Sequence, residues 1–253
     1  PVMCINDLRE IIIPTYLAKI LGIELPKYQA SVYSSNFPNY LEKISTGIRS
    51  LDRAMKGGVE VGSLTGFVGA FGSGKSQLCH QLAVMVQLPA GEGGLGSGAV
   101  YVDTEGGFRP ERLAAMAEYR GLDPQQALEK TTYVRTREWK QLVRVLRGSK
   151  AKLLIVDSLS WLFRGAENRK EVYMLRSIMY SILALAVEWA LKNRSVFVFT
   201  SHGYKNRSYG DPYLSLFSLL RFWTIRERES LRIFCCGREF RATITEGGIL
   251  EAD

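Results

Sequence analysis

A segment of eight residues, 69–76, constrains the fold of this chain more than any other feature of the sequence. It matches the pattern GxxxxGK[ST], in which glycines let backbone N–H groups surround phosphate oxygens without steric clashes. The apolar run Leu64–Val68 precedes it, and the helical pattern Gly74–Gln87 follows it. This order of strand, phosphate loop and helix predicts that a nucleoside triphosphate binds at the helix N-terminus. The weaker alternative is a glycine-rich turn that matches the pattern by chance. The candidate residues of this phosphate loop are Gly69, Ala70, Phe71, Gly72, Ser73, Gly74, Lys75 and Ser76.

Two acidic strand ends accompany the phosphate loop. We expect Lys75 to reach the β- and γ-phosphates and the hydroxyl of Ser76 to ligate magnesium. The apolar run Lys152–Asp157 ends in a carboxylate, so Asp157 is predicted to hold the magnesium through water, although many central strands end in Asp. A further apolar strand leads to Glu105, which is then placed to polarise the water that attacks the γ-phosphate. A solvated loop acid is the alternative reading of Glu105.

Apolar runs alternate with helical patterns over most of the chain. Such alternation predicts an α/β fold whose mostly parallel central sheet is covered by helices on both faces. After residue 220 the pattern changes to short strands joined by tight turns, which predicts a C-terminal antiparallel extension. The expected strands are Ser63–Ala70, Ala99–Thr104, Thr131–Val134, Lys152–Asp157, Ser195–Ser201, Arg221–Arg226, Leu231–Cys236 and Phe240–Thr245. The expected helices are Gly74–Gln87, Pro110–Arg120, Thr136–Arg147 and Asn168–Lys192.

Composition divides the chain into two parts and limits its class. Residues 1–43 have a helical pattern followed by a polar, aromatic linker, and we place the ATPase-like core at 44–253. No run of about 18 apolar residues occurs, so no membrane span is expected, and Ile178–Leu191 is interpreted as a buried helix. No signal peptide is evident, and the four cysteines lack metal-ligand spacing, which together favour a cytoplasmic protein with reduced thiols. His80 is interpreted as a packed helix residue.

The charge balance favours a polyanionic partner. Lys and Arg total 33 against 25 Asp and Glu, which gives a net charge of +8. A predicted helical face carries Arg137, Lys140, Arg144 and Arg147, although such a ridge is more often simply solvated. Other cations are interleaved with aromatic residues, a combination that suits single-stranded DNA because cations track phosphates while rings stack on bases. These candidate DNA-binding residues are Arg164, Arg169, Lys170, Lys205 and Arg207.

Several stretches together resemble one known family. They are residues 44–47 (ISTG), 57–60 (GGVE), 69–80 (GAFGSGKSQLCH) and 101–113 (YVDTEGGFRPERL). From about Ile44 to Ile249 the chain closely resembles the archaeal RadA branch of the RecA-family recombinases. The resemblance implies a RecA-type core that binds ATP and magnesium, hydrolyses ATP and acts on DNA in recombinational repair. It also implies that Glu105 activates water, that Arg112 lies over adenine and that Gln77 belongs to the nucleotide site.

The same resemblance places two DNA-binding loops, at Phe163–Val172 and Gly203–Pro212. His202 stands where the resembling recombinases carry a glutamine that senses the γ-phosphate. We hypothesise that His202 links nucleotide state to the second loop, and a polar residue at a strand end is the alternative. The sequence departs from the family in two places. Residues 1–43 contain no helix-hairpin-helix pattern. The segment that in the family reaches a neighbouring subunit's nucleotide is also missing, and Cys235–Arg238 form only a tight connection at that position.

These departures favour a core-only paralogue over the recombinase itself. The leading hypothesis is an ATPase that assists recombination by binding single-stranded DNA, the recombinase or both. The second is a nucleotide-dependent interaction module that binds the recombinase and hardly touches DNA. The third, a strand-exchange enzyme that forms filaments alone, is disfavoured because the cross-subunit segment is missing. We therefore expect a monomer or small oligomer.

Overall fold

The computed structural model describes residues 42–165, 168–204, 207–209, 211, 213–228 and 230–252. The predicted N-terminal segment of residues 1–43 therefore lies almost wholly outside the described residues. The first described element is a two-stranded sheet, in which β1 (Lys43–Ile44) pairs with β2 (Val59–Glu60). Ile44 and Val59 are fully buried, so this small sheet is part of the core.

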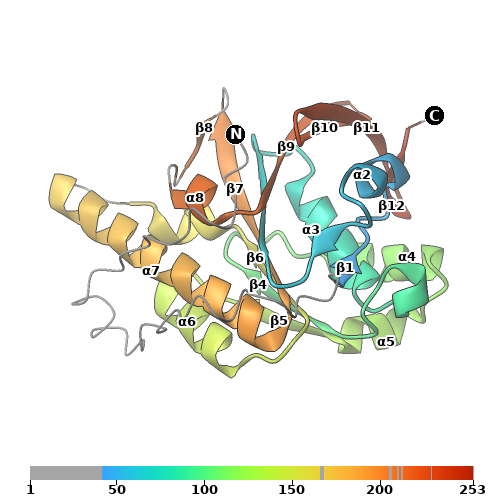
Figure 1. Cartoon of the computed structure of the whole chain (residues 1–253), viewed down its shortest axis with the longest axis horizontal. Coiled ribbons are helices and arrows are strands. Elements are labelled where there is room, and N and C mark those ends of the chain that lie inside the picture. The colour runs from blue at the N-terminus through green and yellow to red at the C-terminus, as the bar shows by residue number, and fades with distance from the viewer. Residues whose placement is uncertain are drawn as a thin grey trace, which may run out of the picture.

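Six strands form a parallel central sheet in the order β9-β3-β7-β6-β4-β5 (Figure 1). Its strands β3, β4 and β6 are buried along their whole length, because helices cover both faces and the sequence there is almost continuously apolar. Their carboxyl ends carry the phosphate loop, Glu105 and Asp157 to one edge of the sheet. The bounds are β3 Leu64–Gly69, β4 Ala99–Asp103, β5 Thr131–Arg135, β6 Leu153–Asp157, β7 Val196–Tyr204 and β9 Leu220–Glu227.

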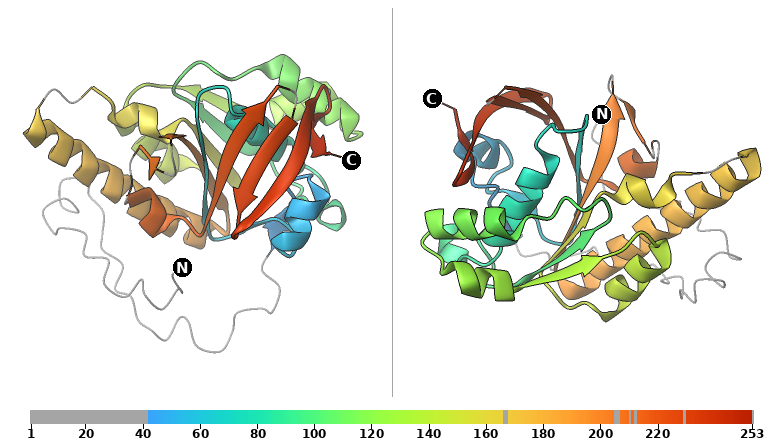
Figure 2. Two further views of the ribbon diagram at one scale, coloured as in Figure 1. Left: turned by 90° about the horizontal axis from the view of Figure 1, so that it is seen from above. Right: turned by 180° about the vertical axis from the view of Figure 1, so that it is seen from behind.

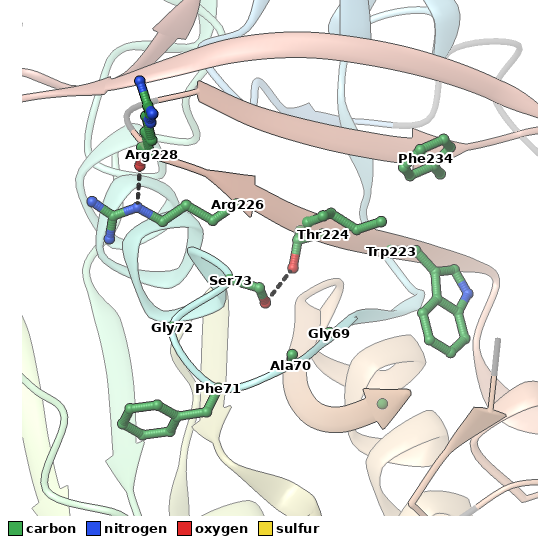
Figure 3. A pocket seen from close by; sticks show the side chains of 12 residues that line it. Gly69, Ala70, Phe71, Gly72, Ser73, Trp223, Thr224, Arg226, Arg228 and Phe234 are labelled. Atoms are coloured by element: carbon green, nitrogen blue, oxygen red, sulfur yellow. Dashed lines mark hydrogen bonds between the residues drawn. The ribbon is translucent and has the colours of Figure 1, made fainter. Parts of the chain in front are cut away.

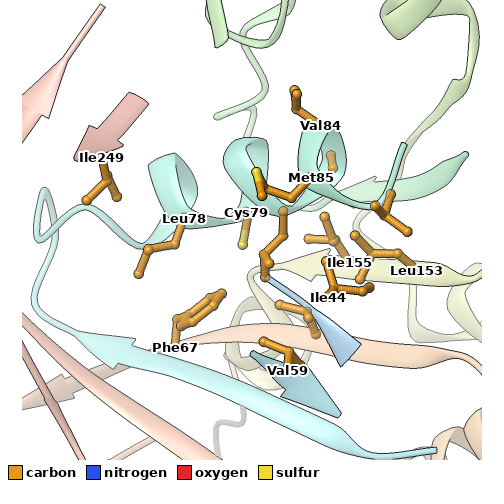
Figure 4. Close-up of a cluster of buried hydrophobic side chains, with 14 of the residues drawn as sticks. Ile44, Val59, Phe67, Leu78, Cys79, Val84, Met85, Leu153, Ile155 and Ile249 are labelled. Atoms are coloured by element: carbon orange, nitrogen blue, oxygen red, sulfur yellow. The ribbon is translucent and has the colours of Figure 1, made fainter. Parts of the chain in front are cut away.

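Helices lie on opposite sides of this sheet (Figure 2). On one face α3 (Lys75–Met85), α4 (Pro110–Tyr119) and α5 (Pro124–Glu129) enclose an apolar cluster with Phe67 and Ile155 (Figure 4). On the other face α6 (Trp139–Gly148) and α7 (Arg169–Asn193) bury a second cluster. Shorter helical elements are α2 Arg49–Ala54, η3 Ala90–Glu92, η4 Leu159–Phe163 and α8 Tyr213–Phe217.

The C-terminal extension is antiparallel. Strands β10 (Ser230–Cys235), β11 (Arg238–Thr245) and β12 (Gly248–Glu251) follow β9 in order, and a short β8 (Arg207–Ser208) pairs with β7. The predicted fold class is therefore confirmed: an α/β core with a mostly parallel sheet and an antiparallel extension. Figure 2 shows the extension curling beside the core.

The element boundaries differ from the sequence-based expectation in places. The short elements α2, α5 and β12 were not predicted, because segments of four to six residues carry too little periodicity. Helix α6 begins at Trp139 and not at Thr136, so Arg137 precedes the helix and does not share its face with Lys140, Arg144 and Arg147. The last three are exposed.

Helix α7 is long and apolar enough to cross a membrane by length and composition alone, contrary to the expectation from apolar runs. About 44% of its most apolar 18-residue window is buried inside the protein. Ile182, Leu183 and Ala186 contribute to the second apolar cluster. Because the core helices of many proteins are equally long and apolar, the helix is weak evidence for a membrane span.

Candidate nucleotide-binding site

The phosphate loop connects β3 to α3, as the sequence predicts. Gly74 caps the helix with a φ of 88°, in the left-handed region that glycine tolerates best. A Cβ on Gly74 would also lie 3.1 Å from Cδ1 of Leu231, so the loop packs closely on the C-terminal extension. The N-terminus of α3, with its unpaired N–H groups and partial positive charge, is thereby directed at the carboxyl edge of the sheet.

The amino group of Lys75 is held by the loop itself. Its Nζ donates hydrogen bonds to the carbonyl oxygens of Ala70 at 2.6 Å and Gly69 at 3.1 Å. Burial lowers the pKa of Lys75, and the negative charges of Asp157 and Glu105 partly offset this effect. The cation and both predicted carboxylates therefore lie within electrostatic range of one another, as their positions at neighbouring strand ends require.

Asp157 is buried and oriented by two hydroxyl groups. Thr200 donates to its Oδ1 at 2.6 Å, and Tyr101 donates to its Oδ2 at 2.8 Å. A Cβ placed on Gly107 would lie 3.8 Å from Oγ of Ser76 and 3.9 Å from Oδ2 of Asp157. Gly107 therefore leaves open a space that the hydroxyl and the carboxylate share, and such hard oxygen ligands suit Mg²⁺.

Within the described residues, no cluster of three or more His, Cys, Asp or Glu side chains could hold a metal ion. Mg²⁺ in nucleotide sites is held by one or two protein oxygens together with phosphates and water. The donor set of Ser76 and Asp157 thus fits the predicted ion.

Asp103, which the sequence analysis did not single out, shapes the loop that carries Glu105. Its carboxylate accepts hydrogen bonds from the backbone N–H groups of residues 105–108 at 2.6–3.2 Å. It also accepts a bond from the hydroxyl of Tyr133 and pairs with Arg135 at 3.1 Å. Burial raises the pKa of Asp103, but the backbone hydrogen bonds and Arg135 outweigh it, so the pKa lies below its usual value. The loop is folded around an ionised aspartate.

Glu105 contacts His202 directly. Nε2 of His202 lies 2.9 Å from Oε1 of Glu105, and both side chains are about one-quarter exposed. This hydrogen bond lowers the pKa of Glu105 below its usual value, against the opposing effect of burial. His202 lies inside β7, which continues to Tyr204, and not after the strand as the sequence suggested. The predicted water-activating residue and the predicted nucleotide-sensing residue therefore form a pair.

His80 is packed inside the protein, as expected, and it also joins two parts of the site. Its Nε2 accepts a hydrogen bond from the backbone N–H of Arg109 at 3.0 Å, so its Nδ1 carries the proton and donates to the carbonyl of Ser76. Burial lowers the pKa of His80, which keeps the ring neutral. The ring stacks on Phe108 and contacts Tyr101. The loop of Glu105 is thus fastened to the first turn of α3.

Arg112 and Gln77 meet at the start of α4 and α3. Nε and Nη2 of Arg112 donate to Oε1 of Gln77 at 3.1 and 2.9 Å, and its terminal nitrogens also donate to the carbonyls of Thr245 and Glu246. These residues, with Thr243, Ile244 and Arg226, line a cavity of about 520 Å³. The guanidinium plane is therefore fixed at the wall of a cavity beside the first turn of α3.

A second cavity of about 830 Å³ lies between the phosphate loop and β9–β10 (Figure 3). Trp223 and Phe234 form an aromatic wall, and the hydroxyl of Thr224 lies 2.9 Å from that of Ser73. Phe71, at the outer end of the loop, is 87% exposed. The larger cavity is thus lined by the phosphate loop itself, and the smaller one by Gln77, the residue that follows the loop.

The candidate DNA-binding cations are brought together only in part. Arg164 is exposed and lies over the rings of Trp161 at 4.8 Å and Tyr209 at 5.8 Å. Arg169 and Lys170 are exposed in the first turn of α7, so part of the first predicted loop is helical. Lys205 lies outside the described residues, as do residues 206, 210 and 212 of the second loop, and Arg207 is placed only by its backbone in β8.

The two predicted loops are connected to the Glu105–His202 pair. The backbone N–H of Tyr209 donates to the carbonyl of His202 at 2.8 Å, and its hydroxyl donates to the carbonyl of Phe163 at 2.7 Å. The backbone N–H of His202 contacts Oγ of Ser160 at 3.3 Å. The sequence placed Phe163 and Tyr209 in the two predicted loops but did not indicate these hydrogen bonds, because their partners are distant in sequence.

Comparison with known proteins places the chain in one family. The Rad51 family model matches residues 39–186, more than half of the chain. A protein described as "DNA repair and recombination protein RadA" from Ignicoccus hospitalis is 45% identical over 144 residues, which cover 51% of this chain and 44% of that protein. A protein of the same description from Aeropyrum pernix is 41% identical over 152 residues, covering 56% of this chain and 46% of its own length.

The match thus spans somewhat less than half the length of these relatives. The matched family range includes the phosphate loop, Glu105, Arg112 and Asp157. His202 and the C-terminal extension lie beyond it, so their roles are judged from the geometry alone.

Proposed function

Because this chain belongs to the Rad51 family, we propose that it binds and hydrolyses ATP and thereby controls contacts with single-stranded DNA in recombinational repair. The observation that carries this proposal is the contact between Glu105 and His202, at 2.9 Å. It connects the proposed general base to the strand that leads into the second predicted DNA loop. The two relatives are described as DNA repair and recombination proteins, which agrees with this role.

ATP binding would use groups that the fold already holds in place. The phosphates would meet the N–H groups of the phosphate loop and the start of α3, and Lys75 would turn from the carbonyls of Gly69 and Ala70 to them. The adenine would enter the smaller cavity, against the fixed guanidinium of Arg112. Cation–π and stacking contacts of this kind favour an aromatic base.

Magnesium, held by Ser76 and Asp157, would neutralise charge on the phosphates when bound. The protein's own contribution is orientation. Tyr101 and Thr200 fix both oxygens of Asp157, and His80 fixes the backbone of Ser76 relative to the loop of Glu105. Three side chains that sequence analysis did not assign to the site, or assigned only to packing, therefore position the two predicted ligands.

Glu105 is the proposed general base. Its lowered pKa keeps the carboxylate ionised at neutral pH, so that it can accept a proton from the attacking water. His202 donates a hydrogen bond to that carboxylate and makes it a weaker base. A change in this contact when ATP binds would alter both the reactivity of Glu105 and the position of β7.

DNA contact would follow from the same set of hydrogen bonds. The carbonyl of His202 holds Tyr209, and Tyr209 in turn contacts Phe163 and Arg164. Arg164, Trp161 and Tyr209 form an exposed cation-and-ring group of the kind that binds bases and phosphates of single strands. A movement of His202 would therefore be transmitted to Arg164 through Tyr209.

A second function, binding of a recombinase protein, is favoured by one different observation. Tyr173 and Met174 on α7 are 63% and 54% exposed, and such adjacent apolar side chains suit a protein contact. In this reading nucleotide would regulate a protein partner and DNA affinity would be low.

The experiment that tests the proposal measures binding of fluorescent single-stranded DNA by anisotropy, without nucleotide, with ATP and magnesium, and with ADP. We expect salt-dependent binding that ATP changes several-fold, because phosphate contacts release counterions. Wild-type protein that binds no single strand in any nucleotide state would reject the DNA-binding proposal and leave the protein-binding function.

A further inference from the structure

Arg226 in β9 faces the phosphate loop, and neither the sequence motifs nor the proposed mechanism uses it. Thr224, two positions earlier, points at the loop, because its hydroxyl lies 2.9 Å from Oγ of Ser73. Alternate residues of a strand lie on the same face, so Arg226 emerges on the same side as Thr224. Figure 3 shows its side chain beside Ser73 and Gly72.

The cross-strand partner of Arg226 gives the same orientation independently. Arg226 is paired with Leu231 of β10, and such antiparallel partners place their side chains on one face. Leu231 is fully buried and lies against Gly74 at the start of α3. Arg226 therefore stands over the end of the phosphate loop and the beginning of α3.

Arg226 also lies between the two cavities of the site. It lines the larger cavity with Ser73 and Gly72, and the smaller one with Gln77 and Arg112. In the described part of the chain it is the one residue that lines both. Arg226 therefore borders both the cavity at Arg112 and the cavity at the phosphate loop.

The guanidinium group is available for a ligand. Its Nε donates to the carbonyl of Arg228 at 2.8 Å, and among the described residues neither terminal nitrogen has a polar partner. The neighbouring acid, Glu227, pairs with Arg232 at 3.1 Å instead. Within the described residues Arg226 is thus an exposed, anchored cation whose two terminal nitrogens are unpaired.

We propose that Arg226 binds the phosphates of the nucleotide held by the phosphate loop of the same chain. This inference rests on the proposed function, since it needs a nucleotide at residues 69–76. The planar fork of arginine matches phosphate oxygens in a bidentate way, and the bond through Nε already limits its freedom. The C-terminal extension, through Arg226, then completes a site that Lys75 and α3 begin.

The test titrates the full chain with two ligands, ATP with magnesium and inorganic tripolyphosphate, which lacks both base and ribose. The variants are Arg226→Ala, Arg226→Lys, Lys75→Ala and a control, Arg238→Ala, which removes an exposed arginine of β11 that lines neither cavity. Circular dichroism establishes that each variant is folded. Titrations at low and high salt separate charge from packing.

We expect Arg226→Ala to weaken binding of both ligands about tenfold at low salt and less at high salt. Arg226→Lys should recover part of this loss, and Arg238→Ala should bind like wild type. Equal affinities for wild type and Arg226→Ala would overturn the inference, and so would a loss seen with ATP but not with tripolyphosphate. If Lys75→Ala also binds ATP like wild type, the proposed function itself fails.

Discussion

Replacing His202 with alanine tests whether the Glu105–His202 contact transmits nucleotide state. A hydrogen bond to a charged group contributes about 1.5–3 kcal/mol, and the partial exposure of this pair places it near the lower limit. About 1.5 kcal/mol corresponds to roughly a tenfold change in an equilibrium constant. The effect of ATP on single-strand affinity, if this contact carries it, should therefore be at most about tenfold in wild type.

His202→Ala should leave the affinity for ATP within a few-fold and abolish the ATP effect on the DNA or recombinase partner. His202→Gln, which can still donate a hydrogen bond, should retain part of the effect. The assay is fluorescence anisotropy of labelled single-stranded DNA with and without ATP for the three proteins. An unchanged ATP effect in His202→Ala would refute the reasoning and reduce His202 to a polar residue in a strand.

The same substitution has a consequence for pH dependence. Because the bond from His202 lowers the pKa of Glu105, its loss should raise that pKa towards the ordinary value of a glutamate. Hydrolysis needs the ionised carboxylate, so it declines as pH falls through the pKa of Glu105. The acidic limb of the pH–rate profile should therefore move to higher pH in His202→Ala; an unmoved limb would show that the bond does not act on the base.

Three further predictions concern other residues. Glu105→Gln should keep ATP affinity and lose hydrolysis, because the amide cannot accept the proton of water; phosphate release by this variant at the wild-type rate would exclude Glu105 as the base. Replacing Arg164, Arg169, Lys205 and Arg207 together with alanine should weaken single-strand binding and flatten its salt dependence while ATP binding stays unchanged. If this variant binds single strands like wild type, these four residues do not form the DNA site, and Lys140, Arg144 and Arg147 become the next candidates. Asp103→Asn should lower the melting temperature at neutral pH. Because the pKa of Asp103 is lowered by folding, its ionised carboxylate contributes stability that is present above about pH 3.9 and is lost as pH falls through the folded-state pKa. The melting temperatures of variant and wild type should therefore converge in acid, and a difference that does not narrow would contradict this assignment.

The fold was predictable from the sequence because its signals are local. Long apolar runs ending in the phosphate loop, Glu105 and Asp157 indicate buried parallel strands, and the structure has them with ends shifted by at most one residue. Short elements such as α5 depend on one cap, in which Asp123 accepts a bond from the N–H of Gln126, and this is easily overlooked. The antiparallel extension was recognisable by its tight turns.

The candidate site was predictable only where motif and strand end coincide. Tyr101, Asp103 and Thr200 form hydrogen bonds with residues on other strands, and nothing in a one-dimensional pattern indicates such partners. His80 was assigned to packing, which is correct but incomplete, since both of its ring nitrogens are used. Arg226 was seen only as the end of a strand.

The measurement that tests the central claim most directly is a calorimetric titration of the protein with ATP and magnesium, for wild type, Lys75→Ala and the control Lys150→Ala. Lys75 is a buried cation at the phosphate loop, whereas Lys150 is an exposed lysine before β6. We predict one ATP site per chain, lost for the most part in Lys75→Ala because the phosphate charge is left uncompensated, and unchanged in Lys150→Ala. Equal ATP affinity for Lys75→Ala and wild type, with both proteins folded, would contradict the assignment of residues 69–76 as the nucleotide site.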